Sequence, residues 1–217
     1  MSQKSNRTFF VRTVLSCATV MAMAMTATMT AVIGAARAQN TLPLEKPLSA
    51  ERLMMPLFPN GWIEASSTRG NIEMIDYVPQ DQSAGVWRDR ITLEVYHDLN
   101  SLPLDVLYGR IQAVMRAQCD GVIAGRFQSG VNNGYPSAFW TFGCKRNLGS
   151  GMGETRYSKA IQGETRVYVL TRAWQTPVYG DQGPDIPQRD IEDAVAFLTT
   201  AVVCADGDPN HACPQPR

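Results

Sequence analysis

Residues 87–97 read WRDRITLEVYH, and they establish the class of the fold. Ile91, Leu93 and Val95 alternate with polar residues at a period of two, which is the pattern of a β-strand with one buried and one exposed face. From Ser101 to Gln118, apolar residues then recur at spacings of three and four, as on one side of an amphipathic helix. A strand followed directly by a helix indicates a domain that contains both kinds of element.

Turn-forming segments divide the rest of the chain into further strands. GVNNG at 130–134 and QGE at 162–164 have the length and glycine content of β-hairpin turns. Apolar residues on both faces of the segment after the second turn indicate a central strand. One expected strand begins at Trp62. The other six span residues 72–78, 87–97, 122–128, 135–144, 154–161 and 165–174.

A second apolar stripe, from Ile191 to Val202, predicts an amphipathic helix near the C-terminus. Hairpin-length connections between strands produce antiparallel sheets. We therefore expect an α+β fold with an antiparallel sheet of about six to seven strands, one helix after the third strand and one helix at the C-terminus.

The N-terminal residues have the three parts of a secretory signal peptide. Residues 1–12 are basic, residues 13–33 are uncharged and mostly apolar, and Ala36-Arg37-Ala38 matches the small-residue cleavage pattern. The apolar run contains several threonines, which favours cleavage after Ala38 over an uncleaved membrane anchor. A lipoprotein signal at Cys17 is disfavoured, because the apolar run continues beyond it. These features predict export to the periplasm.

The expected organisation of the chain follows from these segments. Residues 1–38 form the signal peptide, 39–56 a flexible leader, 57–204 a single α+β domain, and 205–217 a C-terminal tail tied by Cys213. No stretch after the signal segment is long and apolar enough to span a membrane, so the mature protein is expected to be soluble.

Four cysteines remain after the signal segment, and an even number in an exported chain predicts disulfide bonds. Three connectivities are possible for four cysteines. We favour Cys119 with Cys144 and Cys204 with Cys213, because each pair brackets a single local unit. A zinc site is disfavoured, because no two of these cysteines have the short spacing of paired zinc ligands.

The charge balance argues against nucleic acid as a partner. The chain has 20 basic and 20 acidic side chains, and residues 1–38 hold four of the bases and no acid. Residues 39–217 therefore carry 16 bases against 20 acids. A protein that binds nucleic acid needs a basic face to neutralise phosphates.

Few residues qualify for catalysis. His97 and His211 are the histidines of the chain, and histidine is the usual base for a serine or cysteine nucleophile. His97 ends the strand quoted above beside Asp98, but adjacent strand residues point to opposite faces, so the two side chains are not expected to meet. A hydrolase that uses His97, or a carboxylate such as Asp89 or Glu94, is kept as an alternative.

Two segments resemble cofactor sites only in part. Asp206, Asp208 and Asn210 alternate like the first ligands of a calcium loop, but His211 takes the place of its glycine and Arg217 the place of its glutamate. Residues 147–153 are rich in glycine but lack the Lys-Ser/Thr pair of a phosphate-binding loop. We therefore expect no metal and no cofactor.

Basic and acidic residues share several of the predicted strands. Cross-strand ion pairs on an exposed face account for them without a ligand. The bases are Arg88, Arg90, Arg156, Arg166 and Arg172, and the acids are Glu94, Glu154 and Glu164.

Several segments resemble uncharacterised exported proteins of Gram-negative bacteria. They are Tyr77-Val78-Pro79, Trp87 with Ile91-Thr92, Lys159-Ala160-Ile161-Gln162-Gly163, and the stretch from Ala196-Phe197-Leu198 to Cys204. The turn Phe58-Pro59-Asn60-Gly61-Trp62 and the order of strands and helices are similar to the PsbP/Mog1-type α/β sandwich domains of small exported proteins. The resemblance implies an architecture and a location, and it implies no functional residue.

The expected function is that of an exported, soluble periplasmic domain with no evident catalytic set and with a binding or accessory role in the cell envelope. Its expected partner is another envelope protein or a small ligand that contacts the face of the sheet. A periplasmic hydrolase and a disulfide-stabilised inhibitor or immunity-type protein are the alternatives.

Overall fold

The strand quoted first lies inside a sheet, between two other strands. In the computed structural model, which describes residues 51–215, it is β4 (Asp89–Tyr96). It pairs with β3 (Ile72–Pro79) on one side and with β9 (Val167–Thr176) on the other. The expected signal peptide, residues 1–38, and most of the expected leader lie outside the described residues.

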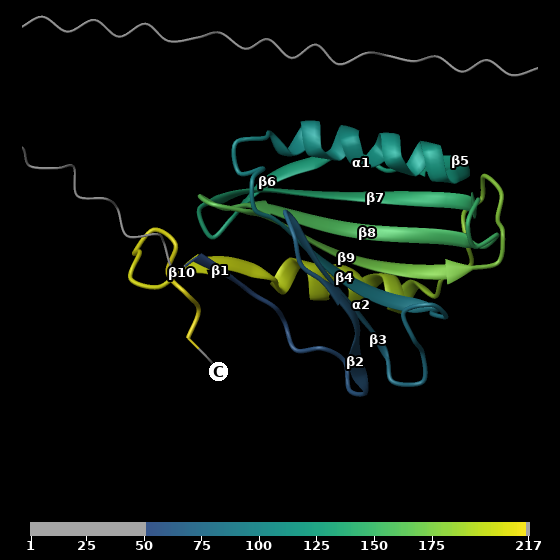
Figure 1. The fold of residues 1–217 in the computed structure, drawn as a ribbon, viewed down its shortest axis with the longest axis horizontal. Coiled ribbons are helices and arrows are strands. Elements are labelled where there is room, and N and C mark those ends of the chain that lie inside the picture. The colour runs from purple at the N-terminus through teal and green to yellow at the C-terminus, as the bar shows by residue number, and fades with distance from the viewer. Residues whose placement is uncertain (1–50, 216–217) are drawn as a thin grey trace, which may run out of the picture. The chain divides into compact units, whose positions relative to one another are not determined.

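Within the described residues, the main sheet has eight strands, and all its neighbouring pairs are antiparallel (Figure 1). The strands besides β3, β4 and β9 are β2 (Trp62–Thr68), β5 (Cys119–Ala124), β6 (Gln128–Asn132), β7 (Tyr135–Asn147) and β8 (Gly153–Gln162). Their order is β2-β3-β4-β9-β8-β7-β5, and β6 pairs with β7 as well. The strand expected over 122–128 is replaced by β5 and β6, because the 13 residues of β7 are enough to pair with both in turn.

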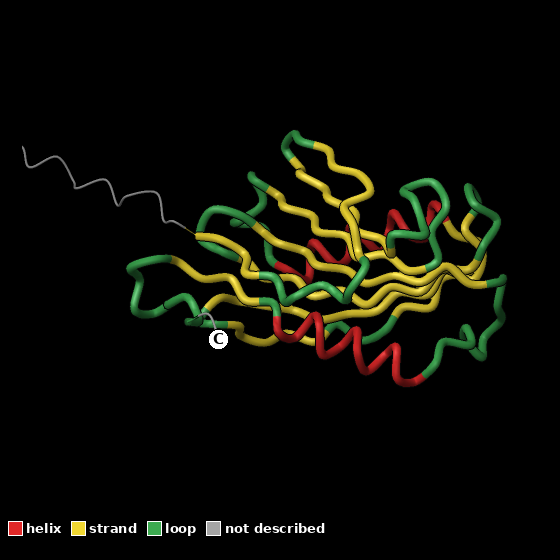
Figure 2. Tube along the Cα trace, turned by 90° about the horizontal axis from the view of Figure 1, so that it is seen from below, coloured by secondary structure: helices red, strands yellow, loops and turns green. Residues whose placement is uncertain are grey.

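Helices lie on both sides of this sheet, as Figure 2 shows. α1 (Leu104–Gln118) buries Leu107 and Met115 on one face, and α2 (Gln188–Thr200) buries Leu198 on the other. The α+β class is therefore confirmed, and so are the positions of the two helices, one after the third strand of the main sheet and one near the C-terminus. The main sheet is slightly larger than the six to seven strands expected.

Both faces of β4 are covered, so the expectation of one exposed face is wrong. Ile91 is fully buried on the α2 side, and Thr92 on the opposite side is only 8% exposed. The Thr92 hydroxyl donates a 2.6 Å hydrogen bond to Asp76 of β3, which is itself buried. The polar residues of the alternating pattern therefore lie in the interior on the α1 side.

A two-stranded sheet packs on the α2 side of the main sheet. β1 (Glu51–Met54) pairs with β10 (Val202–Ala205) in antiparallel register. Leu53 of β1 and Val203 of β10 contact the same hydrophobic cluster, which includes Val95 of β4. The start of the described chain and its last strand are therefore part of the core.

These two strands correct the sequence analysis at both ends of the domain. The leader expected over 39–56 is a strand at 51–54, and the helix expected to reach Val202 ends at Thr200. Val202 and Val203 are β-branched, and such residues favour strands over helices when a neighbouring strand is available.

Both expected disulfides are present, and the favoured pairing is confirmed. Cys119–Cys144 joins β5 to β7, and Cys204–Cys213 closes the C-terminal tail into a loop. The two bonds span sequence separations of 25 and 9 residues. By restricting the unfolded chain, each bond is expected to stabilise the fold by about 2–4 kcal/mol.

The Glu51 side chain attaches β1 to the turn between β8 and β9. Glu51 is 8% exposed, and its carboxylate accepts hydrogen bonds from the backbone N–H of Glu164 at 2.6 Å and from the hydroxyls of Thr165 and Tyr168 at 3.3 Å. Gly163 lets the carboxylate approach, because a Cβ at that position would overlap the Glu51 oxygens.

All described residues fall within one compact unit. None of the helices in residues 51–215 has both the length and the apolar character that crossing a membrane requires.

Replacing Gly163 by alanine is expected to lower the free energy of unfolding by about 1–3 kcal/mol, because the new methyl group overlaps the buried Glu51 carboxylate. Gly180→Ala is the control, since a Cβ there meets no atom within 4 Å, and it is expected to change the stability by less than about 1 kcal/mol. Urea denaturation of both variants measures the difference. Equal stabilities would contradict the role of Glu51 in anchoring β1.

Candidate functional site

A cavity of about 340 Å³ lies between α1 and the face of the main sheet. The side formed by α1 is mostly apolar and consists of Leu107, Arg110, Ile111, Val114 and Met115. The sheet contributes the floor, from strands β4, β7, β8 and β9. The cavity is therefore apolar on the side formed by α1, and its floor includes the polar residues Glu94, Arg156, Ser158 and Thr171.

Small hydroxyl residues on adjacent strands explain why this space is open. The register of the sheet places Thr92, Thr171 and Ser158 in one row across β4, β9 and β8. The row continues on β7 with Trp140, which fills the space under α1. Ser158 and Thr171 are too small to reach the helix, and their hydroxyls hydrogen-bond to each other at 2.8 Å. The short side chains of Ser158 and Thr171 leave the hollow, and Phe142 of β7 also lines it.

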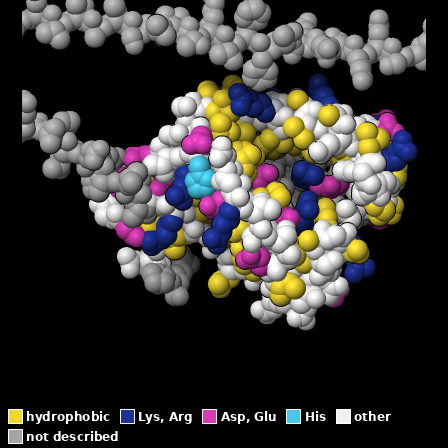
Figure 3. Space-filling model, viewed as in Figure 1, with side chains coloured by type: hydrophobic (Ala, Val, Ile, Leu, Met, Phe, Trp, Pro, Cys, Tyr) yellow, Lys and Arg dark blue, Asp and Glu magenta, His cyan; other side chains and the backbone are white. Residues whose placement is uncertain are grey.

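Charged residues lie beside this row. Arg156 donates a 2.5 Å hydrogen bond from Nε to Oε1 of Glu154, and Nη2 of Arg90 lies 3.9 Å from the same oxygen. Arg90 also lies 3.7 Å from Oδ1 of Asp76, through Nε. Ala173 stands between Arg90 and Arg156 in the register, so both guanidinium groups can approach one carboxylate. Figure 3 shows basic and acidic side chains together in a hollow on this face.

These ion pairs were expected on an exposed face, and that expectation is wrong for the central ones. Glu154 is 3% exposed and Asp76 is 6% exposed.

Glu94 is the acidic residue that lines the cavity. Burial raises the pKa of its carboxyl group, and the hydrogen bond with Tyr96 and the charge of Arg156 oppose that rise only in part. Tyr96, two residues further along the same face of β4, also lines the cavity, and its pKa is raised by burial and by the charge of Glu94. Glu94 can therefore hold a proton at a higher pH than an exposed glutamate, and it can then donate as well as accept a hydrogen bond.

The candidate catalytic residues of the sequence analysis do not come together. His97 lies just after β4, is not among the residues that line the cavity, and places Nε2 3.2 Å from Oε1 of Glu73. Asp89 forms an ion pair with Arg172, with contacts of 2.7 and 3.2 Å, on the face of the sheet opposite to Glu94. Of the three candidates, only Glu94 reaches the cavity.

A second groove, on the α2 side, contains Lys159. Nζ of Lys159 donates hydrogen bonds to the carbonyl oxygens of Thr199 at 2.9 Å and Ala201 at 2.7 Å, at the C-terminal end of α2. A cation at this end is favoured by the helix dipole. Burial lowers the pKa of Lys159 to about 8. The contacts of Lys159 thus serve to hold α2 on the sheet.

The α1 residues of the cavity were missed in the sequence analysis. Ile111 and Val114 belong to the apolar stripe of the helix, which indicates packing but does not show where the packing is incomplete. The row of small hydroxyl residues, Thr92, Thr171 and Ser158, could have indicated the cavity. These residues form a row only once the order and register of the strands are known.

No family model matches this chain, and no curated protein matches it in sequence. Among solved structures, the chain is similar to PA94 of Pseudomonas aeruginosa, a protein of unknown function, with a TM-score of 0.42 and 14% identity over 78% of this chain and 100% of that one. It is also similar to the Ran-binding protein Mog1p of Saccharomyces cerevisiae, with a TM-score of 0.37 and 8% identity over 69% of this chain and 84% of that one.

The other of these structures is LpqN of Mycobacterium tuberculosis, which is involved in cell envelope biogenesis, with a TM-score of 0.38 and 10% identity over 73% of this chain and 87% of that one. At identities of 14% or less the likeness concerns the fold alone, and the function is argued from the residues of this chain.

The raised pKa of Glu94 predicts a dependence of stability on pH. Between the pKa of an unfolded glutamate, about 4.3, and the higher pKa in the folded state, the folded state binds more protons, so the free energy of unfolding falls as the pH rises. Glu94→Gln removes this contribution, so the stability of the wild type relative to this variant is expected to decline from pH 4 towards neutrality. Urea denaturation at several pH values measures it, with the exposed Glu64→Gln as control. A constant difference over this range would show that burial does not perturb Glu94.

Proposed function

We propose that this chain is an exported, soluble periplasmic domain that binds a small amphipathic ligand in the cavity beneath α1, in an accessory role in the cell envelope. The observation that carries the proposal is the cavity itself, which has an apolar wall and a floor of hydroxyl and charged groups. Pockets that bind small molecules have this composition, in which apolar surface supplies affinity and a few polar groups fix the orientation.

The lining residues define the chemistry of the ligand. Ile111, Val114 and Val169 offer contacts to an apolar body. Glu94 and Arg156 offer a carboxyl and a guanidinium group to a polar head. A volume of about 340 Å³ lies in the lower part of the range for small-molecule pockets. The ligand is therefore a compact molecule with one apolar and one hydrogen-bonding end.

Two features support the proposed location. Residues 1–38 have the sequence pattern of a cleaved signal peptide. The four cysteines of the described residues form two disulfides, and structural disulfides persist in oxidising compartments such as the periplasm. Both features are independent of the cavity.

The hydrolase alternative now depends on Glu94, because this residue lies in the cavity and has a raised pKa. Tyr96, Ser158 and Thr171 bring hydroxyl groups into the same cavity, and those of Ser158 and Thr171 hydrogen-bond to each other. Turnover of ester substrates that is abolished in Glu94→Gln would favour this alternative over binding alone.

Filling the cavity is expected to remove binding. Ile111→Trp places a larger side chain in the cavity, and it should weaken the binding of an anilinonaphthalene sulfonate probe by about tenfold or more, equivalent to about 1.4 kcal/mol. Val106→Trp is the matched control, because Val106 is on the same helix, is 42% exposed and does not line the cavity. Fluorescence titration measures both affinities.

Competition with octanoate, octanol and octylamine then identifies the preferred head group. Displacement of the probe by at least one of them is expected for the wild type. A wild type that binds neither probe nor competitors, or equal probe affinity in the Ile111→Trp and Val106→Trp variants, would refute binding in this cavity.

A further inference from the structure

The C-terminal loop is held against the tip of the β6–β7 hairpin. The hairpin turns at Asn133 and Gly134, which have φ angles of 50° and 82°, as a two-residue turn requires. Nδ2 of Asn133 donates hydrogen bonds to the carbonyl oxygens of Val203 at 2.9 Å and Ala212 at 3.2 Å. The loop closed by the Cys204–Cys213 disulfide therefore has a defined position on the domain.

His211 is oriented within this loop by two contacts. Its ring stacks on Tyr135 with 3.8 Å between ring centroids, and Nδ1 lies 2.8 Å from the carbonyl oxygen of Asn133. A carbonyl oxygen can only accept, so Nδ1 carries the hydrogen and Nε2 of the neutral ring has a lone pair. Histidines that bind metals have this arrangement, in which one ring nitrogen donates to a backbone carbonyl and the other faces the metal.

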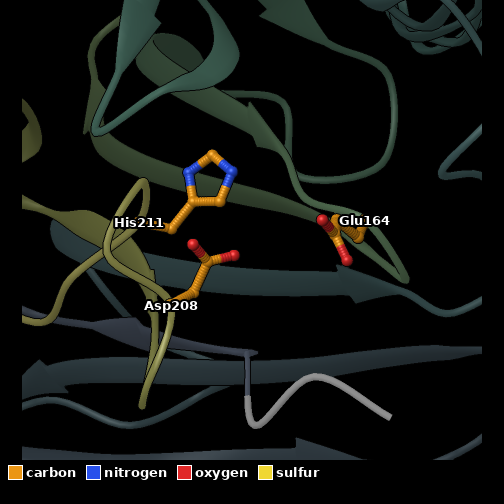
Figure 4. A group of neighbouring side chains, drawn as sticks. All are labelled: Glu164, Asp208 and His211. Carbon is orange, nitrogen blue, oxygen red and sulfur yellow. The ribbon is translucent and has the colours of Figure 1, made fainter. Parts of the chain in front are cut away.

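Two carboxylates converge on this imidazole. Asp208 comes from the same loop, and Glu164 comes from the turn between β8 and β9 (Figure 4). One ligand atom from each of Glu164, Asp208 and His211 lies within 4.8 Å of the other two. The backbone of Asp208 is fixed by the loop, since its carbonyl accepts from the N–H of His211 at 3.2 Å.

An unsatisfied hydroxyl group beside this cluster is a second, independent observation. Tyr135 is 3% exposed, and its buried hydroxyl has no hydrogen-bond partner within the described part of the chain. A phenolic hydroxyl is a hydrogen-bond donor, and within the described residues this one donates to no neighbouring carboxylate. A water molecule held at the cluster would accept its hydrogen bond.

We propose that Glu164, Asp208 and His211 bind a divalent transition-metal ion, for which Zn²⁺ has the best-matched chemistry, with a water molecule as the fourth ligand and a hydrogen bond from Tyr135 to that water. One imidazole nitrogen and two carboxylate oxygens are ligands that zinc accepts in tetrahedral sites. Calcium prefers six to eight oxygen ligands, and an imidazole does not serve it. The ion joins the turn after β8 to the C-terminal loop.

This site goes beyond the proposed ligand-binding function, and it departs from the expectation of no metal. The calcium-loop pattern in 206–211 contains two of the three ligands, and it fails because its own spacing does not complete a site. Glu164 is 44 residues before Asp208 in the sequence, and only the fold brings the two together. Spacing along the chain therefore could not show this cluster.

Calorimetric titration of the purified, oxidised chain with ZnCl₂ after treatment with EDTA tests the proposal. We expect one ion per chain and an upward shift in the midpoint of thermal unfolding. Asp208→Asn and His211→Gln should each weaken zinc binding by about 100-fold or more, and Tyr135→Phe, which keeps the stacked ring, by about tenfold. A visible absorption band of the Co²⁺-loaded chain reports tetrahedral geometry, and it should be lost in Asp208→Asn.

Two variants serve as controls. Asp206→Asn alters the same loop at a residue that pairs with Arg52, and His97→Gln removes the other histidine, so both should retain the wild-type affinity for zinc. Circular dichroism establishes that each variant is folded. The proposal is overturned by a wild type that binds no zinc, by unchanged affinity in folded Asp208→Asn and His211→Gln, or by a preference for CaCl₂ over ZnCl₂.

Discussion

Burial of both faces of one sheet is the constraint on which the rest of the structure depends. Eight strands present two surfaces, and helix α1 covers one while α2 and the β1–β10 pair cover the other. Removing apolar surface from water is the main stabilising contribution to such a fold. The cavity, the buried ion pairs and the packing of the β1–β10 pair all result from the way these covering elements fit over the sheet.

The cover on the α1 side is incomplete, and polar residues occupy the gap. Asp76, Arg90, Glu154 and Arg156 form a connected group there, in which each charge has an opposite charge close by. Burying a charge without an opposite charge nearby is costly, so these close opposite charges make the burial tolerable, although Nε of Arg90 has no hydrogen-bond partner among the described residues. Arg156 belongs to this group and also lines the cavity with Glu94, so the proposed amphipathic ligand would meet charged groups beneath an apolar helix.

Much of the fold could be predicted from local patterns. The period-two strand, the amphipathic helices, the hairpin turns and the cysteine pairs all depend on residues close in sequence, and each was found where it was expected. The errors have a common cause. β1 and β10 are short and acquire their conformation by pairing with each other, although their paired residues Glu51 and Ala205 are distant in sequence. Both faces of β4 are buried for the same reason, since the covering elements come from elsewhere in the chain.

The sites were less accessible to sequence reasoning than the fold. Glu94 was considered as a catalytic carboxylate, but its place in a cavity depends on the register of four strands and on the path of α1. His211 and Asp208 were considered as parts of a calcium loop, and their third neighbour comes from a different turn. Functional clusters of this kind are set by tertiary contacts, which a linear motif does not encode.

The disulfide between Cys204 and Cys213 makes the C-terminal loop a covalent ring that carries both Asp208 and His211. Within such a ring, these two side chains cannot move far apart, so the entropy lost in bringing them together is lost when the thiols are oxidised. Oxidation and occupancy of the proposed ion site then reinforce each other by the same factor, because coupling between two equilibria is reciprocal. With the proposed site, an oxidising, metal-containing compartment would order the loop between Cys204 and Cys213 more strongly than a reducing one.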